Sequence, residues 1–277
     1  MLRVDQISVK AGRKGPTLLH GVSFRSLPGE FLVVLGANGS GKSTLLRTIG
    51  GDLHASTGAI RWKGRALAEH DLRVLSQQRA FLDQQSRVPF AFTAREIVRM
   101  GRYPFFRQAP SAADEEAVDV ALSAMHAEHF QHRTMPSLSG GEQRRVHIAR
   151  VLAQLHGTEE GALLMMDEPL NDLDIKHQHA VLAIAREKAR SGACVIAVLH
   201  DVDLAARYAD RILLMKQGRS LAQGVPAEVL DAGLLSAVYD MEAEVLHDAR
   251  TGERRVRFGP RNTARGIPIN EPENWNA

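Results

Sequence analysis

Residues 36–44 read Gly-Ala-Asn-Gly-Ser-Gly-Lys-Ser-Thr and fit the P-loop spacing G-x-x-x-x-G-K-S. Glycines in such a loop let successive backbone N–H groups point at phosphate oxygens, and the following helix adds its positive dipole end. Lys42 would reach the β- and γ-phosphates, while Ser43 would hold Mg²⁺. The predicted nucleotide-binding residues of this loop are Gly36, Ala37, Asn38, Gly39, Ser40, Gly41, Lys42, Ser43 and Thr44.

The chain on either side of this loop has the character that a P-loop requires. An apolar run, Phe31–Leu35, precedes it and a helical stretch, Leu45–Ile49, follows it, which predicts a strand, a loop and a helix. Composition alone would produce such a match in about one chain in a hundred of this length. A glycine-rich turn without a ligand is therefore the weaker interpretation.

A second apolar run, Leu163–Met166, ends in two carboxylates, Asp167 and Glu168. Ligands of open α/β sheets bind at the carboxyl ends of strands, so Asp167 is predicted to bind Mg²⁺ beside the P-loop. Glu168 is predicted to face the γ-phosphate, where a carboxylate can orient and polarise an attacking water. An apolar run followed by Asp-Glu is a weak signal alone, but the P-loop upstream makes it strong.

Residues 138–143, Leu-Ser-Gly-Gly-Glu-Gln, open an amphipathic helix that is predicted to run through Leu155. Ser139 and Glu142 have the spacing of a capping box, which is a purely structural role. The adjacent Gly140 and Gly141 would also leave bare N–H groups at the helix start, and these form an anion site. The buried stripe of this helix is expected to contain Val146, Ala149 and Leu152.

The elements that must position these residues follow an α/β pattern. Near-continuous apolar runs are typical of parallel strands buried on both faces, and alternating runs are typical of an antiparallel edge. Between residues 90 and 136 strand signals give way to capping pairs, Thr93 with Glu96 and Ser111 with Asp114, which predict a helical insertion. The predicted strands are Phe31–Leu35, Leu163–Met166, Val195–Leu199 and Ile212–Met215, with Leu2–Val9 and Ala59–Trp62 at the antiparallel edge.

We therefore expect one α/β domain over residues 1–258. Its core would comprise residues 1–88 and 137–225, and its helical subdomain residues 89–136. Residues 226–277 would form a C-terminal helix and a partly frayed tail, since prolines and asparagines without apolar periodicity follow Gly259.

Composition excludes several classes of protein. The formal net charge is +3 and the basic residues are dispersed without interleaved aromatic residues, so nucleic-acid binding is disfavoured. No apolar run reaches the roughly 18 residues that a membrane-spanning helix needs, which limits any membrane role to a peripheral one. The one cysteine, Cys194, precedes an apolar run and is expected to be a buried thiol in a reducing compartment.

The hexapeptide Leu-Ser-Gly-Gly-Glu-Gln resembles the signature of ATP-binding-cassette (ABC) ATPases, and it lies between the P-loop and Asp167-Glu168 as in that family. The resemblance covers nearly the whole chain. It implies a P-loop NTPase core with an antiparallel β edge and an inserted α-helical subdomain. It further implies that the chain hydrolyses ATP with Mg²⁺ as cofactor.

The resemblance also implies roles for further residues. Gln77 resembles the family's Q-loop glutamine, which contacts Mg²⁺ and the nucleotide and senses the membrane partner, and Gln78 is its rival. Asp174 resembles the dimer-contacting aspartate of the D-loop, although Asn171 and Asp172 stand where the family usually has Ser-Ala. His200 resembles the switch histidine. Without the family, His200 would more often be a strand-end histidine without catalytic function.

Two cassettes of this family face each other head to tail when ATP is bound. The resemblance therefore implies a homodimer in which Ser139, Gly140, Gly141 and Glu142 of one subunit complete the γ-phosphate site of the other. Residues 90–93 and 100–104 are similar to the helical region of importer cassettes for iron chelates and cobalamin. Four other stretches are most similar to the haem-import subset: residues 149–154, 177–182, 199–210 and 245–252.

An importer cassette implies an ATPase at the cytoplasmic face of the inner membrane, working with integral membrane permease subunits and indirectly with a periplasmic haem-binding protein. Ferric siderophore or cobalamin import is the alternative within this class. A soluble ABC ATPase acting on DNA or ribosomes, and a nucleotide-binding regulator without turnover, are the rivals from other classes. A soluble ABC ATPase of that kind would need coiled-coil insertions or two cassettes in one chain. A regulator without turnover would lack the catalytic base or the P-loop lysine, yet Lys42, Glu168 and His200 are present.

Three further expectations follow from individual residues. The segment from Gln77 to Phe106 is expected to dock the permease, because aromatic residues are unusually dense from Phe90 onward. Stretch 9–13 lacks the aromatic ring that such cassettes usually place against adenine, which predicts weak selection between ATP and GTP. His177 and His179 lie in a polar stretch and are expected to be exposed, as are the histidines at 126, 129 and 132.

Overall fold

A six-stranded sheet forms the centre of the computed structural model, which describes residues 1–12, 14–84, 91–158, 160–247 and 254–260. Five strands run parallel in the order β9-β3-β8-β7-β6, and β10 lies antiparallel beside β9. The strands are β3 (Phe31–Leu35), β6 (Arg79–Leu82), β7 (Leu163–Asp167), β8 (Cys194–Val198), β9 (Arg211–Lys216) and β10 (Arg219–Gly224). The four predicted strands of this sheet are confirmed, but β6 and β10 are additions.

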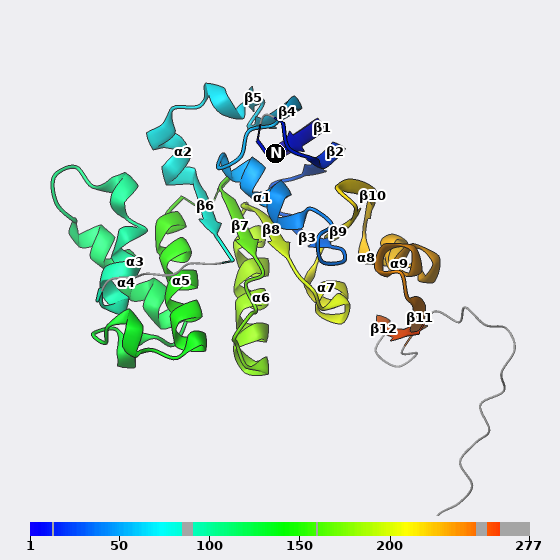
Figure 1. Cartoon of the computed structure of the whole chain (residues 1–277). Coiled ribbons are helices and arrows are strands. Elements are labelled where there is room, and N and C mark those ends of the chain that lie inside the picture. The colour runs from blue at the N-terminus through cyan, green and yellow to red at the C-terminus, as the bar shows by residue number, and fades with distance from the viewer. Residues whose placement is uncertain (13, 85–90, 159, 248–253, 261–277) are drawn as a thin grey trace, which may run out of the picture.

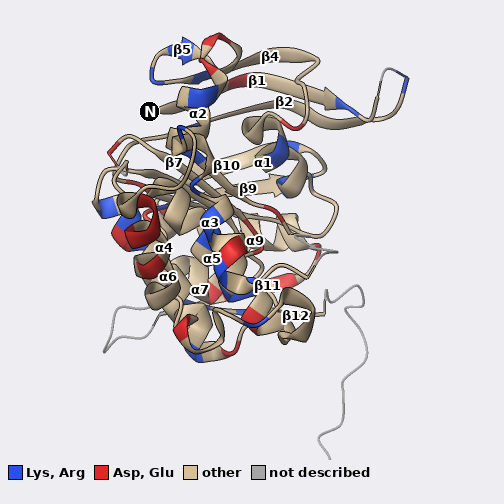
Figure 2. Ribbon diagram, turned by 90° about the vertical axis from the view of Figure 1, so that its left-hand side faces the viewer, with Lys and Arg blue, Asp and Glu red and all other residues tan. Residues whose placement is uncertain are grey.

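A separate four-stranded antiparallel sheet, ordered β2-β1-β4-β5, covers one side of the central sheet (Figures 1 and 2). Its strands are β1 (Leu2–Lys10), β2 (Thr17–Ser26), β4 (Thr57–Trp62) and β5 (Arg65–Ala66). The predicted antiparallel edge is thus confirmed in β1 and β4, while β2 was not predicted. A backbone hydrogen bond from His20 N to Gly218 O, 2.8 Å long, connects the two sheets.

Helices fill the remaining layers, and the predicted caps are at their starts. Thr93 caps α3 and Ser111 caps α4, each in a capping box, so the predicted helical insertion is confirmed. Ser139 and Glu142 form the predicted box at the start of α5. The longer helices are α1 (Lys42–Gly50), α2 (Leu72–Gln78), α3 (Ala94–Met100), α4 (Ala112–Ala124), α5 (Gly140–Leu155), α6 (Ile175–Arg190) and α7 (Val202–Tyr208). Short 3-10 turns are η1 (Leu67–Glu69), η2 (Tyr103–Phe105), η3 (Glu128–Phe130) and η4 (Met135–Ser137).

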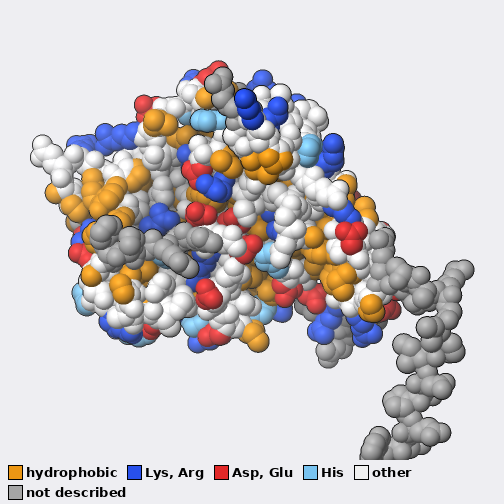
Figure 3. All heavy atoms as spheres, viewed as in Figure 1, with side chains coloured by type: hydrophobic (Ala, Val, Ile, Leu, Met, Phe, Trp, Pro, Cys, Tyr) orange, Lys and Arg blue, Asp and Glu red, His pale blue; other side chains and the backbone are white. Residues whose placement is uncertain are grey.

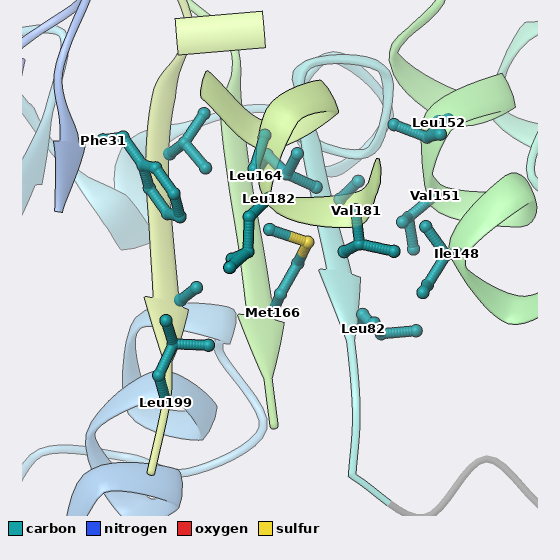
Figure 4. Packing of buried hydrophobic residues seen from close by; sticks show 14 of the residues in the cluster. Phe31, Leu82, Ile148, Val151, Leu152, Leu164, Met166, Val181, Leu182 and Leu199 are labelled. Atoms are coloured by element: carbon teal, nitrogen blue, oxygen red, sulfur yellow. The ribbon is translucent and has the colours of Figure 1, made fainter. Parts of the chain in front are cut away.

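Two hydrophobic clusters lie on opposite faces of the central sheet. Successive residues of β3 alternate between them: Val33 packs toward the helical side, whereas Leu32 and Val34 pack toward α1 and the antiparallel sheet. Figure 4 shows the helical side, where side chains from α5 and α6 meet those of β6, β7 and β8. Cys194 is fully buried in the other cluster, as expected.

The helical insertion shares its core with the central sheet. Residues of α3 and α4 belong to the same buried cluster as the sheet, because α5 packs against both helices and against β6. A buried ion pair joins α4 to the end of α3, with Arg102 Nε donating to Asp114 Oδ1 at 3.0 Å. Arg102 also donates to the carbonyls of Ala153 and His156 at the end of α5.

The C-terminal part contains more structure than the single helix that was predicted. After β10 follow α8 (Pro226–Val229), α9 (Ala232–Tyr239) and a hairpin of β11 (Glu242–His247) and β12 (Arg254–Gly259). The hairpin is fastened to the core by Val256 N, which donates to Asp203 Oδ1 of α7 at 2.8 Å. The predicted frayed tail beyond residue 260 lies outside the described residues. Across the described part of the chain, every helix is too short or too polar to cross a membrane.

Candidate functional site

The carboxyl ends of four parallel strands bring the predicted chemistry together. The P-loop follows β3, Asp167 and Glu168 lie at the end of β7, His200 follows β8, and Gln84 follows β6. The P-loop, Glu168, His200 and Gln84 line a cavity of about 670 Å³, as expected for a ligand site of a parallel sheet, and Asp167 is buried beside Ser43 of the P-loop. Its lining comprises Leu18, Asn38, Gly39, Ser40, Gly41, Lys42, Ser43, Thr44, Gln84, Glu168, Asn171 and His200.

Two glycines allow the tight backbone of the P-loop. Gly41, with φ of 97°, is the residue before α1, and this left-handed conformation costs glycine little. At Gly36 an added Cβ would lie 2.3 Å from the carbonyl oxygen of Met215, so a larger residue cannot fit without moving β9. Gly218 N donates to Ser40 O at 2.9 Å and holds the loop against the β9–β10 turn.

Lys42 points back into the P-loop. Its Nζ donates to Gly36 O at 2.7 Å and to Ala37 O at 3.1 Å. Burial lowers the pKa of this ammonium, and the charges of Glu168 and Asp167 act in the opposite direction. The structure thus holds a buried cation against the loop whose backbone would surround phosphates.

Ser43 and Asp167 are brought together from distant parts of the chain. Ser43 Oγ donates to Asp167 Oδ1 at 3.1 Å. Asp167 is 1% exposed, and its Oδ2 is buried without a hydrogen-bond partner among the described residues. Burial raises the pKa of this carboxyl above its usual range. An orphaned carboxylate oxygen beside a hydroxyl is the oxygen-rich donor set that Mg²⁺ prefers, so the residues fit that ion.

Glu168 is held by three side chains from different loops. Its Oε1 lies 2.8 Å from His200 Nε2, and its Oε2 accepts hydrogen bonds of 2.8 Å from Gln84 Nε2 and Asn171 Nδ2. Burial pushes the pKa of Glu168 upward, but these hydrogen bonds and His200 outweigh burial and lower it. Its backbone has φ of 48°, a left-handed conformation that is uncommon outside glycine and concentrates at functional sites.

The prediction that Gln77 or Gln78 contacts the nucleotide is wrong in this structure. Both residues end α2, before β6, and so lie at the opposite end of that strand from the cavity. Gln77 Nε2 donates to Pro104 O at 2.9 Å, and Gln78 Oε1 accepts from Lys63 Nζ. The glutamine that lines the cavity is Gln84, which was missed because the strand before it was not predicted.

Arg144 is a second residue that the sequence did not reveal. It lies on α5, is 6% exposed, and donates to backbone carbonyls in two neighbouring loops. Its Nη2 donates to the carbonyls of Asp167 and Glu168 at 2.7 and 2.6 Å. Its Nη1 donates to Asp83 O at 3.0 Å, directly before Gln84, and its Nε to Pro169 O at 3.3 Å. Arg144 therefore links the signature helix to both loops.

The signature residues and Asp174 are not brought to this cavity. Ser139 and Gly140 are exposed at the start of α5, and an added Cβ at Gly141 would lie 2.7 Å from Asp172 O. Asp174 caps α6, accepting from His177 N at 2.9 Å, and its side chain is 66% exposed. The signature residues at the start of α5 and Asp174 at the start of α6 therefore lie where a second molecule could reach them.

Two histidines differ from expectation. His177 and His179, predicted to be exposed, are half-buried, because His177 Nδ1 contacts Asp174 Oδ1 and His179 Nδ1 contacts the Tyr208 hydroxyl, each at 2.8 Å.

Comparisons with known proteins agree with this geometry. A family described as ABC transporter matches residues 19–171. The hemin import ATP-binding protein HmuV of Pseudomonas fluorescens (strain Pf0-1) is 46% identical over 245 residues, 88% of this chain and 94% of that protein.

Two solved structures share the fold at 26% identity. A metal-chelate type ABC transporter in an inward-facing conformation has a TM-score of 0.74 and covers 94% of this chain and 96% of its own. A dimeric ATP-binding cassette in a post-hydrolysis state, bound to ADP and phosphate, has a TM-score of 0.71. The match covers 82% of this chain and 99% of that cassette.

Proposed function

The chain belongs to the ABC transporter family, and from its site we propose that it is the ATP-hydrolysing subunit of an importer that energises haem uptake through a separate membrane permease. The observation that carries the ATPase activity is that the P-loop, Glu168 and His200 line one cavity, while Asp167 is hydrogen-bonded to Ser43 of the P-loop. The haem cargo is supported by the similarity to hemin import ATP-binding proteins.

The phosphates of ATP bind at the P-loop. Backbone N–H groups of residues 36–41 and the dipole of α1 face them, and Lys42 supplies a cation at the base of the loop. Ser43 and Asp167 would hold Mg²⁺, since Asp167 Oδ2 has no hydrogen-bond partner among the described residues. Such an ion, when bound, neutralises charge on the β- and γ-phosphates.

Glu168 is the group that accepts the proton of the attacking water. Its lowered pKa keeps it ionised at neutral pH, which is the form that a general base requires. His200 contacts one of its oxygens and Gln84 the other, and these two contacts orient it. Gln84 takes the role that the family resemblance assigns to a Q-loop glutamine, because it alone among the three candidates touches the catalytic carboxylate.

Hydrolysis requires a second copy of the chain. Phosphoryl transfer needs donors around the γ-phosphate that one P-loop does not supply. Ser139, Gly140, Gly141 and Glu142 lie at the start of a helix, partly exposed, and are free to complete the P-loop site of a partner. Asp174 contacts the partner at the same interface. The dimeric cassette with ADP and phosphate supports this arrangement.

The permease docks beside α2 and the turn after α3. Leu72 and Tyr103 are 78% and 57% exposed, and Val74 is 45% exposed. Figure 3 shows hydrophobic side chains gathered on this part of the surface. Arg73 fastens α2 to this turn by donating to Pro104 O and Phe106 O. The docking surface therefore extends the predicted segment, residues 77–106, back to Leu72; Phe90 lies outside the described residues.

Uptake measurements test the proposed function. Cells or proteoliposomes carrying this chain with its permease and periplasmic haem-binding protein should accumulate haem, and Glu168→Gln should abolish accumulation. Ferric siderophore and cobalamin serve as alternative cargoes in the same assay. If either of these accumulates and haem does not, that compound is the cargo and the haem assignment is wrong. Haem uptake that persists in Glu168→Gln would contradict the ATPase role.

Coupling to the permease is tested separately. Leu72→Asp should leave the basal ATPase activity of the purified chain unchanged but abolish uptake, because a charge would face the apolar partner surface. Leu221→Asp is the matched control, since Leu221 is 46% exposed on β10 and away from this surface. Equal uptake by both variants would place the docking surface elsewhere.

A further inference from the structure

A second cavity, of about 590 Å³, lies between α7 and the C-terminal part of the chain. Its lining comes from α6, α7, α8 and β12 and shares no residue with the nucleotide cavity. Figure 1 shows α7, α8 and β12 side by side at the end of the molecule away from α2. Its volume is within the range of about 300–1,000 Å³ that is typical of small-molecule sites.

The charged residues of this cavity favour an anion. Arg207, Arg254 and Arg255 line it, against a single carboxylate, Asp203. Three guanidinium groups against one carboxylate leave the lining with an excess of positive charge, and Arg254 Nη1 also donates to the Ala227 carbonyl. Guanidinium groups bind carboxylates with paired hydrogen bonds.

The remaining lining is largely apolar. Its apolar part consists of Leu204 and Ala206 of α7 and of Val225, Pro226 and Ala227 at the start of α8. Apolar walls with a few polar groups at the rim suit a ligand that has an apolar body and anionic substituents. A small inorganic anion would leave this apolar surface uncovered.

His179 adds the capacity to bind a metal. Its Nδ1 lies 2.8 Å from the Tyr208 hydroxyl, and the two rings are 5.7 Å apart. A histidine whose Nδ1 is held in this way presents Nε2 as a ligand. The described residues contain no group of three side chains that could hold a bare metal ion. A metal ion that is already coordinated by a macrocycle needs only one imidazole from the protein as a further ligand.

We propose that this cavity binds haem, with His179 Nε2 as an axial ligand of the iron and Arg254 and Arg255 paired with the propionates. The apolar walls of α7 and α8 cover the macrocycle. The choice of this metal complex rests on the haem cargo proposed above. The ATPase subunit thus carries a site of its own for the substance that the transporter moves.

Absorbance titration of the purified full chain with hemin tests this proposal. The wild type should bind one equivalent with a shifted Soret band, and His179→Ala should lose that shift. Tyr208→Phe should weaken binding by about tenfold, because it removes the group that orients the ligand. Iron-free protoporphyrin IX should bind the wild type and His179→Ala alike, and Arg255→Ala should weaken its binding.

Matched controls separate this site from adventitious binding. His129→Ala and Arg190→Ala remove an exposed histidine and an exposed arginine elsewhere, and should leave the titration unchanged. His179→Ala should retain ATPase activity, which shows that it folds. Identical spectra for wild type and His179→Ala, or several equivalents bound by every variant, would overturn the proposal. The titration measures haem binding without transport. A negative titration would therefore contradict the second site but not the haem cargo, and a negative uptake assay would contradict the cargo but not a measured binding of hemin.

Discussion

At the scale of single residues, we expect Arg144 to position the loops that carry Glu168 and Gln84 for hydrolysis. Arg144→Lys keeps the charge but loses most of the hydrogen bonds to the loops that carry Glu168 and Gln84. Because misplacement by about 1 Å can cost a hundredfold in rate, we expect kcat for ATP to fall by about ten- to a hundredfold. KM should change little, since the P-loop contacts remain. Steady-state ATPase kinetics measure both.

Arg145→Lys is the matched control for this prediction. Arg145 is also buried on α5, but it donates to the carbonyls of Met125 and His126, away from the catalytic loops. If both variants lose kcat equally, the effect is general destabilisation of α5, and Arg144 has no special role.

Leu18 is the residue at which we test the choice of base. It lines the nucleotide cavity, and the described lining includes no Phe, Tyr or Trp against which adenine could stack. Stacking on an aromatic ring contributes about 1–3 kcal/mol. We therefore expect GTP to be hydrolysed within about tenfold of ATP, a factor worth about 1.4 kcal/mol. Competition assays between ATP and GTP measure this ratio.

Substitution at Leu18 provides the second half of this test. Leu18→Trp should tighten ATP binding, whereas Leu27→Trp, at an equally exposed leucine outside the cavity, should not. A preference for ATP above about a hundredfold in the wild type would mean that another group reads the base.

Much of the candidate site is predictable residue by residue, and the exceptions have physical reasons. The P-loop, Asp167 and His200 adjoin strong apolar runs, so their position at one sheet edge follows from the topology of parallel strands. Gln84 follows a four-residue strand, too short to show a pattern. Arg144 donates to backbone carbonyls, and every residue type has a carbonyl, so the sequence contains no pattern that predicts these partners.

At the scale of elements, the Arg102–Asp114 ion pair joins three helices. Asp114 also closes the capping box of α4, with Oδ2 accepting from Ser111 N and Oγ. Because Asp114→Ala leaves Arg102 buried without its carboxylate, we expect it to lower the free energy of unfolding by about 3–5 kcal/mol. Denaturant unfolding measures this loss. The exposed Glu116→Ala on the same helix should change stability by less than about 0.5 kcal/mol.

The contribution of Asp114 should depend on pH. Burial raises its pKa, but hydrogen bonds from Ser111 and Arg102 outweigh burial and lower it below the unfolded value of about 3.9. A lowered native pKa stabilises the fold above the unfolded pKa and loses this effect as pH falls through the native value. The stability difference between wild type and Asp114→Asn should therefore be constant above about pH 5 and shrink below about pH 4. A difference that grows on acidification would contradict this assignment.

Elements with distinct local signals were predicted well, and those that depend on tertiary pairing were not. The Thr93 and Ser111 capping boxes marked α3 and α4 because the hydrogen bonds are local. In contrast, β2 contains polar and glycine residues and is held by pairing with β1. The β11–β12 hairpin depends likewise on contacts such as Tyr239 with Phe258, whose rings are 5.0 Å apart.

At the scale of the whole molecule, the proposed ATP-bound dimer can be trapped by a change at Glu168. Glu168→Gln keeps the size and hydrogen bonding of the side chain but removes its basicity, so hydrolysis should fall by about 10²–10⁴-fold while ATP still binds. Since hydrolysis normally opens the dimer, this variant should accumulate as an ATP-bound dimer. Size-exclusion chromatography with Mg·ATP measures that state.

Lys42→Ala is the control for this experiment, because it should bind ATP weakly and remain monomeric under the same conditions. A Glu168→Gln variant that elutes as a monomer and hydrolyses ATP at the wild-type rate would remove Glu168 from the mechanism.

The buried thiol has a practical consequence for observing this dimer. Cys194 is the one cysteine of the chain, it is fully buried, and burial raises its pKa, so it should not react with thiol reagents while the protein is folded. A cysteine introduced on the surface would then be the unique attachment point for a spin label or fluorophore. Pairs of such labels, one on each subunit, could follow opening and closure during turnover without any prior removal of native cysteines.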